Sequence, residues 1–328
     1  MTRPKSDEES WNKYWEHGFL TSCRNAFSGN YDGSLKKVWQ DFFLRLPRGS
    51  RILDICTGNG AIAMIANELS IENELNFEIH GIDSAAIRPL ETVKTDRHLL
   101  EGIVFHGETP AEGTPFEEQS FQAVTGQYAF EYTDEERCVT EIARITAPAA
   151  LVQLVVHHTG SIVMETSREE VRNGQIIFAE TRIFERARAM MEIMAGATTA
   201  EARKALAKDT RAEMSRNQLN EAAGRLSEAL RSSPHPQLLQ MAMDKLAEAF
   251  KILENGGAEA ALTHIGTSEQ MLTANIERLE DLMAAGRSPE QVQTIMTNLE
   301  TAGFKLQPAE EIRHEGGPLM GWLLQATR

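Results

Sequence analysis

The sequence is poor in cysteine and lacks any long apolar run. Its three cysteines, Cys23, Cys56 and Cys138, are odd in number and none forms a CxxC pair, so we expect reduced thiols and neither a disulfide framework nor a zinc site. No apolar stretch reaches the roughly 20 residues of a membrane-spanning helix. The first 15 residues are charged and lack the apolar centre of a signal peptide. A cytoplasmic protein without membrane contact is the expectation.

Positive charge is also scarce. The 328 residues contain 33 Lys and Arg against 48 Asp and Glu, for a formal net charge of −15. Nucleic-acid binding gains affinity by neutralising phosphates with Lys and Arg, so this balance disfavours a large nucleic-acid surface and favours a small-molecule or protein partner. The apolar fraction of 41% is enough for a buried core. The length predicts one enlarged domain or two domains.

Strand and helix patterns alternate in the first half of the chain. Two helices are predicted at 7–27 and 34–46, and from residue 51 strand-like and helix-like stretches follow one another. The last of them, ALVQLVVHH at 150–158, is a continuous apolar run typical of a buried parallel strand. The alternation predicts a doubly wound, mostly parallel sheet with helices on both faces. The predicted strands and helices are RILDIC, AIAMIANELS, NFEIHGID, SAAIRPLETVKTDRHLL, GIVFHG, FQAVTGQ and DEERCVTEIARIT.

The second half is different. Residues 161–301 are rich in Ala, Glu, Arg, Met and Leu, and helix starts and breaks punctuate them. GFKLQPAEEI and PLMGWLLQAT then resemble two final strands that return to the sheet as an antiparallel pair. The predicted fold is therefore α/β, with a seven-stranded sheet. Its predicted parts are an N-terminal helical lid or cap at 1–47, an α/β domain at 48–160 and 302–328, and a large helical insertion at 161–301.

One short stretch, ILDICTGNGAIA at 52–63, suggests a ligand. Gly58, Gly60 and Ala63 satisfy a loose G-x-G-x-x-A, the weak form of the dinucleotide fingerprint. In a dinucleotide site the loop amides and the helix N-terminus face a pyrophosphate. The carboxylate of Asp54 at the strand end would repel that anion, whereas it would attract a ligand that carries an ammonium group. A strand-end acid that only bonds loop amides is the alternative reading of Asp54.

Here the sequence resembles the class I S-adenosylmethionine-dependent methyltransferases. Their first motif is approximately D-x-G-x-G-x-G, and the chain has Asp54-Ile-Cys-Thr-Gly58-Asn-Gly60, with Cys56 in place of the first glycine. Asp83 in HGIDSA matches the acid at the end of the second strand. The stretch 106–130 matches the third and fourth motifs, with Glu108 in place of the acid that faces the adenine. The matches occur in order over residues 45–157.

The resemblance implies S-adenosyl-L-methionine as the cofactor and a binding site at the carboxyl ends of the strands. The residues that it places at the cofactor are Asp54, Cys56, Thr57, Gly58, Asn59, Gly60, Asp83, Ser84, Glu108, Thr109 and Gln127. Plainer roles stay open for several of them. Asp83 also fits an N-cap, Glu108 also fits a solvated loop acid, and Gln127 also fits a residue that only satisfies backbone groups.

Methyl transfer is an in-line displacement that needs alignment and exclusion of water rather than a metal, and no metal is expected. Residues after the fourth and fifth strands are expected to meet the acceptor. His157 or His158 could serve as a general base because histidine titrates near neutrality, although adjacent strand residues point to opposite faces. Glu131 is a further catalytic candidate. The substrate-binding candidates are Tyr128, Phe130, Tyr132, Tyr31 and Trp15.

The remaining features leave alternatives open. Trp11, Tyr14 and Trp15 at helical spacing fit core packing, or a lid over the cofactor as the resemblance implies. The Met-rich insertion fits core packing, an acceptor pocket or a homodimerisation arm. The expected acceptor is a small molecule, and a protein or RNA acceptor stays open. The rival functions are an NAD(P)-dependent oxidoreductase and a non-catalytic S-adenosylmethionine-binding or scaffold protein.

Overall fold

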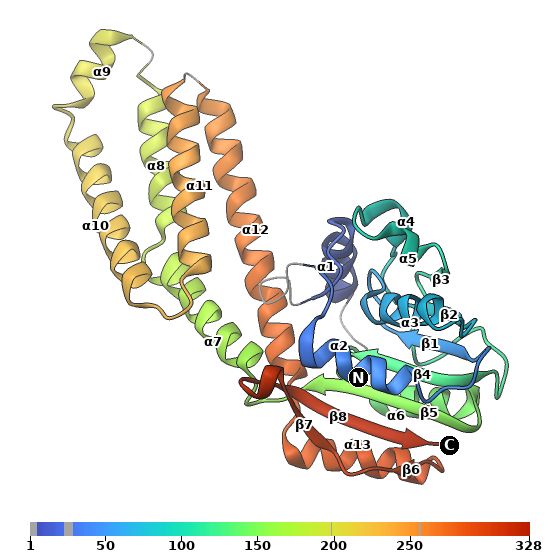
Figure 1. Ribbon diagram of the computed structural model, residues 1–328. Helices are drawn as coiled ribbons and strands as arrows, with labels where there is room; N and C mark the ends of the chain where they lie inside the picture. Colours follow the sequence, from blue (N-terminus) through green and yellow to red (C-terminus); the bar gives the residue numbers. More distant parts are fainter. Residues whose placement is uncertain (1–4, 23–28, 198, 256) are drawn as a thin grey trace. The chain divides into compact units, whose positions relative to one another are not determined.

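The computed structural model describes residues 5–22, 29–197, 199–255 and 257–328 (Figure 1). Cys23 lies outside these ranges. The chain divides into two compact units. The first comprises Met1–Met164 and Ala285–Arg328, and the second comprises Glu165–Ala284. The second unit lies within residues 161–301, the range of the predicted helical insertion.

The first unit is built on a sheet of eight strands among the described residues. The sheet follows the order β3-β2-β1-β4-β5-β8-β6, and β7 also pairs with β8. Strands β1 to β5 are parallel to one another, whereas β8 is antiparallel to β5. The strands are β1 (Arg51–Ile55), β2 (Glu78–Ile82), β3 (Ile103–His106), β4 (Phe121–Gln127), β5 (Thr146–His157), β6 (Lys305–Leu306), β7 (Glu310–Arg313) and β8 (Leu319–Thr327). The predicted mostly parallel α/β sheet is confirmed.

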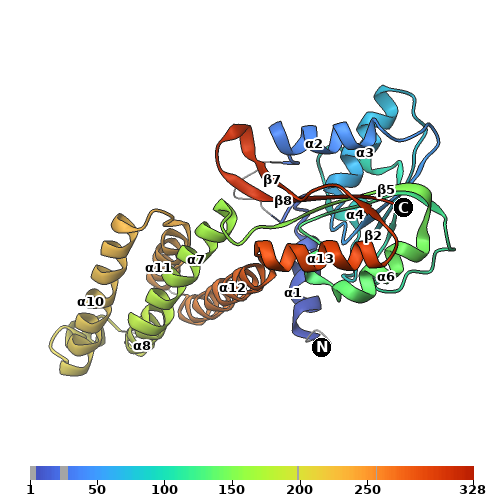
Figure 2. The ribbon, with the colours of Figure 1, turned by 90° about the horizontal axis from the view of Figure 1, so that it is seen from below.

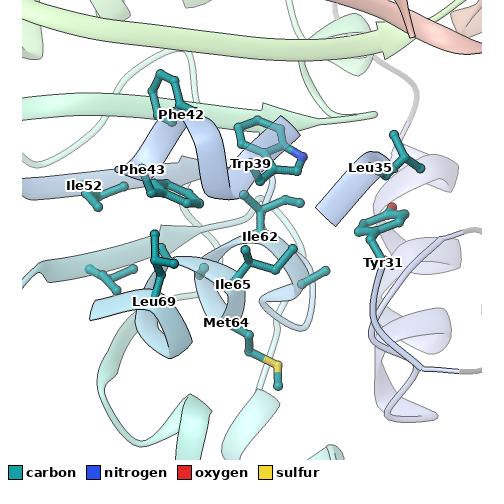
Figure 3. Close-up of a cluster of buried hydrophobic side chains, with 14 of the residues drawn as sticks. Tyr31, Leu35, Trp39, Phe42, Phe43, Ile52, Ile62, Met64, Ile65 and Leu69 are labelled. Atoms are coloured by element: carbon teal, nitrogen blue, oxygen red, sulfur yellow. The ribbon is translucent and has the colours of Figure 1, made fainter. Parts of the chain in front are cut away.

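Helices cover both faces of this sheet. Successive strand residues point to opposite sides, and apolar residues on both sides are buried under helices. On β1, Ile52 belongs to the core under α2 (Gly33–Phe43) and α3 (Ala61–Glu72), as Figure 3 shows. Leu53 belongs to the core under α6 (Glu135–Ile145) and α13 (Pro289–Thr301). Figure 2 shows the two helix pairs on opposite sides of the sheet. The unit also contains α1 (Lys5–Glu16), α4 (Pro89–Thr92), α5 (Arg97–Leu100) and the 3-10 turns η1 (Phe130–Tyr132) and η3 (His314–Gly316).

Three predicted elements differ from the observed ones. The helix predicted at 7–27 ends at Glu16, and Gly18 follows it with a φ of +74°. Of the helix predicted at 84–100, the two short helices α4 and α5 form. No helix precedes α4, which begins at Pro89, because a proline restricts the residue before it. The two predicted final strands become three, because Pro308 has no N–H for a sheet ladder and separates β6 from β7.

The second unit is helical. Its core joins α8, α10 and α11 with Ile177, Phe184, Met191, Leu226, Leu239 and Leu272. The methionine Met191 is fully buried there, so at this position the Met-rich stretch packs into a core. None of the described helices is long and apolar enough to span a membrane. The helices of this part of the chain are α7 (Ile162–Gln175), the π-turn η2 (Ile176–Glu180), α8 (Ile183–Ala195), α9 (Ala200–Leu206), α10 (Thr210–Ser232), α11 (Gln237–Glu254) and α12 (Ala258–Ala285).

Candidate functional site

A cavity of about 70 Å³ lies in the first unit at the carboxyl ends of β1, β2 and β4. The strand order reverses between β1 and β4, and ligands of open α/β sheets bind at such a switch point. Its wall is formed by Trp11, Trp15, Leu20, Thr21, Ser22, Tyr31, Asp54, Ile55, Cys56, Thr57, Ala61, Ile62, Asp83, Ser84, Gln127, Tyr128, Ala129 and Tyr132. The cavity therefore brings together residues from the N-terminal segment, the glycine loop and the ends of three strands.

The loop between β1 and α3 has a left-handed backbone at three positions. The φ angles are +46° at Cys56, +54° at Gly58 and +89° at Gly60. Glycine adopts such angles freely, whereas a residue with a Cβ is strained by them. The Gly60 N–H donates to the Thr57 carbonyl at 2.8 Å, and α3 begins at the next residue. Cys56, which replaces the first glycine of the motif, thus lies at a position where the backbone conformation favours glycine.

Asp54, the last polar residue of β1, is almost fully buried. Its carboxylate accepts hydrogen bonds from the hydroxyls of Thr57 at 2.5 Å and Thr125 at 2.9 Å. Burial raises the pKa of Asp54 to about 7, and the two hydroxyls counteract part of that rise. Near neutral pH this group is therefore poised to lose its proton when a cation approaches.

Asp83 follows β2 and ties that strand end to the glycine loop. One carboxylate oxygen accepts from the Gly58 N–H at 2.8 Å, and the other accepts from the Ala85 N–H at 2.9 Å. No helix begins at this point, since α4 starts at Pro89, so the carboxylate closes a local turn instead of capping a helix. Ser84 beside it also lines the cavity. Asp54 and Asp83 thus lie on one cavity wall, on either side of the loop.

Glu108 and Thr109 lie behind this wall. The Glu108 N–H donates to the Ala85 carbonyl at 3.1 Å, and the Thr109 N–H donates to the Asp83 carbonyl at 2.8 Å. Glu108 has a φ of +53°. Neither residue is part of the cavity lining, so their expected contact with a cofactor stays a prediction.

The N-terminal helix α1 covers the glycine loop. The Trp15 ring packs so closely on Gly58 that a Cβ built there would lie 2.4 Å from it. Trp11 stacks on Trp15 with ring centroids 5.7 Å apart. The Asn59 amide donates to the carbonyls of Trp15 at 3.0 Å and Phe19 at 2.8 Å. The loop expected to bind a cofactor therefore also holds the end of α1.

The end of β4 forms the opposite wall. The Gln127 side-chain oxygen accepts a hydrogen bond from the indole N–H of Trp39 on α2. Tyr128, with a φ of +52°, donates through its hydroxyl to the Met320 carbonyl at 3.2 Å. Tyr31 meets the Tyr128 ring edge-on at 6.5 Å, and Tyr132 also lines the cavity. Four of the five substrate candidates, Trp15, Tyr31, Tyr128 and Tyr132, thus line this cavity.

The other acceptor and catalytic candidates lie outside the cavity lining. Phe130 is fully buried in the core under α6. Glu131 is buried, accepts from the His157 backbone N–H at 2.7 Å and has its pKa raised to about 7 by burial. His157 stacks on Tyr128 at 4.2 Å, and burial lowers its pKa to about 3. His158 instead lies against Trp322 at 4.5 Å.

Several cavity residues carried no signal in the sequence. They are Leu20, Thr21 and Ser22, which follow α1 in a stretch without a motif. Tertiary packing of the segment after Gly18 brings these three residues to the cavity, and no local pattern predicts it. Among the described residues, no cluster of three or more His, Cys, Asp or Glu side chains could hold a metal ion.

Comparison with solved structures finds distant matches. No protein-family model and no curated protein matches the chain. A methyltransferase of Methanosarcina mazei that depends on S-adenosylmethionine (SAM) is 13% identical, with 88% of this chain and 96% of that chain covered and a TM-score of 0.38. Geranyl diphosphate C-methyltransferase of Streptomyces coelicolor A3(2) is 11% identical, with coverages of 47% and 66% and a TM-score of 0.34.

The cyclase SpnF is 20% identical, with 37% of this chain and 44% of that chain covered and a TM-score of 0.30. The chain thus spans less than half the length of that cyclase. All three TM-scores lie below 0.5, so the fold assignment rests on the strand order and register of this chain itself.

Proposed function

We propose that this chain transfers a methyl group from S-adenosylmethionine to a small-molecule acceptor. One observation carries the proposal. Asp54 and Asp83 are buried in one cavity, at the carboxyl ends of adjacent parallel strands and on either side of a glycine loop. This arrangement suits a ligand that presents an ammonium group to one acid and hydroxyls to the other.

The charge of this wall distinguishes the proposal from dinucleotide chemistry. A pyrophosphate at the N-terminus of α3 would stand beside Asp54 and Asp83, which are both buried. It would be repelled by the Asp83 carboxylate and would oppose the ionisation of Asp54, whose pKa is already raised to about 7. An ammonium group has the opposite effect, because it stabilises the ionised form of Asp54. The carboxylate retains lone pairs for it beyond those that Thr57 and Thr125 use. The site therefore favours a cationic ligand over a nicotinamide dinucleotide.

Movement of α1 is part of the proposal. Sites for ligands of this size enclose roughly 300–1,000 Å³, whereas the cavity measures about 70 Å³. Trp15 lies directly on Gly58, where a ligand would approach the loop backbone. We infer that α1 moves to admit the cofactor and then packs on it, as a lid.

When bound, S-adenosylmethionine supplies an activated methyl group for in-line displacement by a nucleophile. The residues of the chain align the partners and exclude water. Tyr31, Tyr128 and Tyr132 give the acceptor an aromatic wall, which suits a small, partly apolar molecule. His157 is neutral at physiological pH because its pKa is about 3. His157 stacks on Tyr128, so we propose that it positions this ring in the acceptor wall, and His157→Ala should lower turnover more than cofactor affinity.

Isothermal titration calorimetry tests the proposal with the product S-adenosylhomocysteine, NAD⁺ and NADP⁺. We expect the full chain to bind S-adenosylhomocysteine and neither dinucleotide. Asp54→Asn should weaken that binding at least tenfold. Asp41→Asn is the matched control, since Asp41 forms an exposed ion pair with Lys37 on α2. Binding of a dinucleotide in place of S-adenosylhomocysteine, or normal binding by Asp54→Asn, would overturn the proposed function.

A further inference from the structure

Two side chains of the cavity lining each contain a buried polar atom that has no hydrogen-bond partner among the described residues. The two atoms are the Thr21 hydroxyl oxygen and the Gln127 side-chain nitrogen, and both are shielded from solvent. Both residues line the cavity that also contains Asp54 and Asp83. Buried polar groups in native proteins are nearly always paired, so each exception calls for an explanation. A ligand of the cavity would supply the missing partners.

The orientation of the Gln127 amide follows from its neighbour. The indole nitrogen of Trp39 can only donate, so the Gln127 atom that it contacts must be the carbonyl oxygen. Trp39 is fully buried in the core shown in Figure 3, and this packing holds the donor in place. The remaining Gln127 atom is therefore an NH₂ group, which can only donate. Whatever meets it must supply a hydrogen-bond acceptor.

Thr21 adds a second group of compatible chemistry. Its side chain is almost fully buried, and its backbone carbonyl is held by the Tyr14 hydroxyl at 2.8 Å. A threonine hydroxyl can donate to an oxygen atom as readily as it accepts. The cavity lining thus combines two acids, Asp54 and Asp83, with two side chains, Thr21 and Gln127, whose donor atoms have no partner among the described residues.

We propose that Thr21 and Gln127 together bind a carboxylate of the ligand that occupies this cavity. The inference rests on the proposed function, which puts a cationic group of the ligand at Asp54. A carboxylate accepts several hydrogen bonds at once and makes stronger ones than a neutral carbonyl. Two sources fit this chemistry: the amino-acid end of the cofactor, or a carboxylate on the methyl acceptor.

Calorimetry with two ligands distinguishes the sources. The ligands are S-adenosylhomocysteine and its decarboxylated analogue, which has an aminopropyl group in place of the amino-acid end. The variants are Thr21→Val, Gln127→Glu, which keeps an acceptor for Trp39 but presents an anion, and Gln127→Met, which removes the donor without adding charge. Gln122→Glu is the matched control, because it lies at the other end of β4 and its side-chain oxygen already accepts from the Arg51 N–H at 2.9 Å.

If the carboxylate belongs to the cofactor, the full chain binds S-adenosylhomocysteine at least tenfold tighter than the analogue. Thr21→Val and both Gln127 variants then reduce that preference at least fivefold, Thr21→Ser restores it, and Gln122→Glu leaves it unchanged. If the carboxylate belongs to the acceptor, these variants bind both ligands normally. The protein saturated with S-adenosylhomocysteine then binds formate, used as a carboxylate probe, and the Thr21→Val and Gln127 variants lose formate binding.

Variants that match the full chain in both the ligand preference and formate binding would overturn the carboxylate site while leaving the proposed function intact. Failure of the full chain to bind S-adenosylhomocysteine would instead overturn the proposed function. In that case formate titration of the ligand-free protein still tests the donor pair. Formate binding by the full chain that the variants lose supports the carboxylate site. Formate binding that is the same in the variants, or absent from the full chain, refutes the carboxylate site. Thermal unfolding of each variant verifies that it is folded.

Discussion

Cys56 illustrates how a single backbone angle shapes the glycine loop. Its φ of +46° lies in the left-handed region, which costs a residue with a Cβ about 1–2 kcal/mol. The methyltransferase motif that the sequence resembles has glycine at this position. The chain retains the loop conformation with a cysteine and bears the strain, and Cys56 lines the cavity.

Replacement of Cys56 by glycine should relieve this strain. We expect Cys56→Gly to raise the free energy of unfolding by about 1 kcal/mol, less than the full strain because glycine also gains freedom in the unfolded chain. Urea denaturation measures the change. Cys56→Ala is the control, since it removes the thiol but keeps the Cβ, and an equal gain in that variant would show that strain is not the cause.

The pKa of Asp54 predicts a pH dependence of cofactor binding. The pKa is raised from 3.8 to about 7 in the ligand-free protein, and an ammonium ligand favours the ionised form. Binding below pH 7 therefore requires loss of a proton, and the affinity for S-adenosylhomocysteine should fall about tenfold per pH unit there and be constant above. Calorimetry between pH 5.5 and 8.5 measures this slope.

Two variants assign the slope to its residue. Asp54→Asn should flatten it, whereas Glu131→Gln should not, although Glu131 has a pKa of about 7 as well. The same linkage affects stability, since a folded-state pKa above the unfolded one favours the folded protein at low pH and loses that advantage as pH rises to 7. Asp54→Asn should therefore raise the melting temperature of the ligand-free protein at pH 8. A slope that survives in Asp54→Asn would contradict this assignment.

The sequence predicts some cavity residues but not others, for physical reasons. Asp54 and Asp83 lie at strand ends, and parallel strands bring their carboxyl ends to one edge, so a local pattern places them together. Phe130 also follows a strand, but the 3-10 turn η1 directs it into the core under α6. Thr21 belongs to the cavity only through tertiary packing, which no periodicity encodes.

Among the elements, α1 links the N-terminal segment to the glycine loop. It is held there by packing of Trp15 on Gly58 and by the Asn59 amide. Short helices have little stability of their own and depend on such contacts. A ligand that first displaces and then contacts Trp11 and Trp15 therefore changes how often α1 opens locally.

Limited proteolysis should detect that change. We expect S-adenosylhomocysteine to slow tryptic cleavage after Lys13 in α1 severalfold, because a bound ligand adds contacts to Trp11 and Trp15 and suppresses local opening. Cleavage after Lys208, in the second unit, is the internal reference. Equal cleavage rates after Lys13 with and without the ligand would argue against a lid.

The strands and helices themselves were predictable to different degrees. β1, β4 and α6 were found because an apolar run or a helical period extends over the whole element. β6 has only two residues, too few for any period. The helix predicted to start at residue 84 does not form ahead of Pro89, because the proline restricts the backbone of the residue before it.

At the scale of the whole molecule, the two units have separate cores. The buried clusters under α2 and under α6 contain residues of the first unit, and the cluster around α8 contains residues of the second. The chain leaves the sheet after His157 and returns at Arg287, whose N–H donates to the His157 carbonyl at 2.8 Å. His158 and Arg287 also form an isolated bridge. The two positions at which the chain enters and leaves the second unit's segment are therefore joined by hydrogen bonds within the first unit.

This adjacency predicts that the second unit can be removed. A variant in which a short Gly-Ser linker replaces residues 165–284 should fold and bind S-adenosylhomocysteine within about threefold of the full chain, because neither core of the first unit is cut. Calorimetry and circular dichroism check the two properties. Loss of binding with an intact fold would show that the second unit contributes to the cofactor site.

The pairing of β5 with β8 has a consequence for synthesis of the chain. His157 and its neighbours on β5 pair with Gly321 and the rest of β8, so more than 160 residues separate the partners along the sequence. Ribosomes add about 5–20 residues per second, which leaves this edge of β5 without its partner for roughly 8 to 30 s. An unpaired apolar edge is a template for aggregation. During synthesis β5 therefore stays unpaired until β8 has been made, and a chaperone that shields β5 during this interval would raise the yield of folded protein.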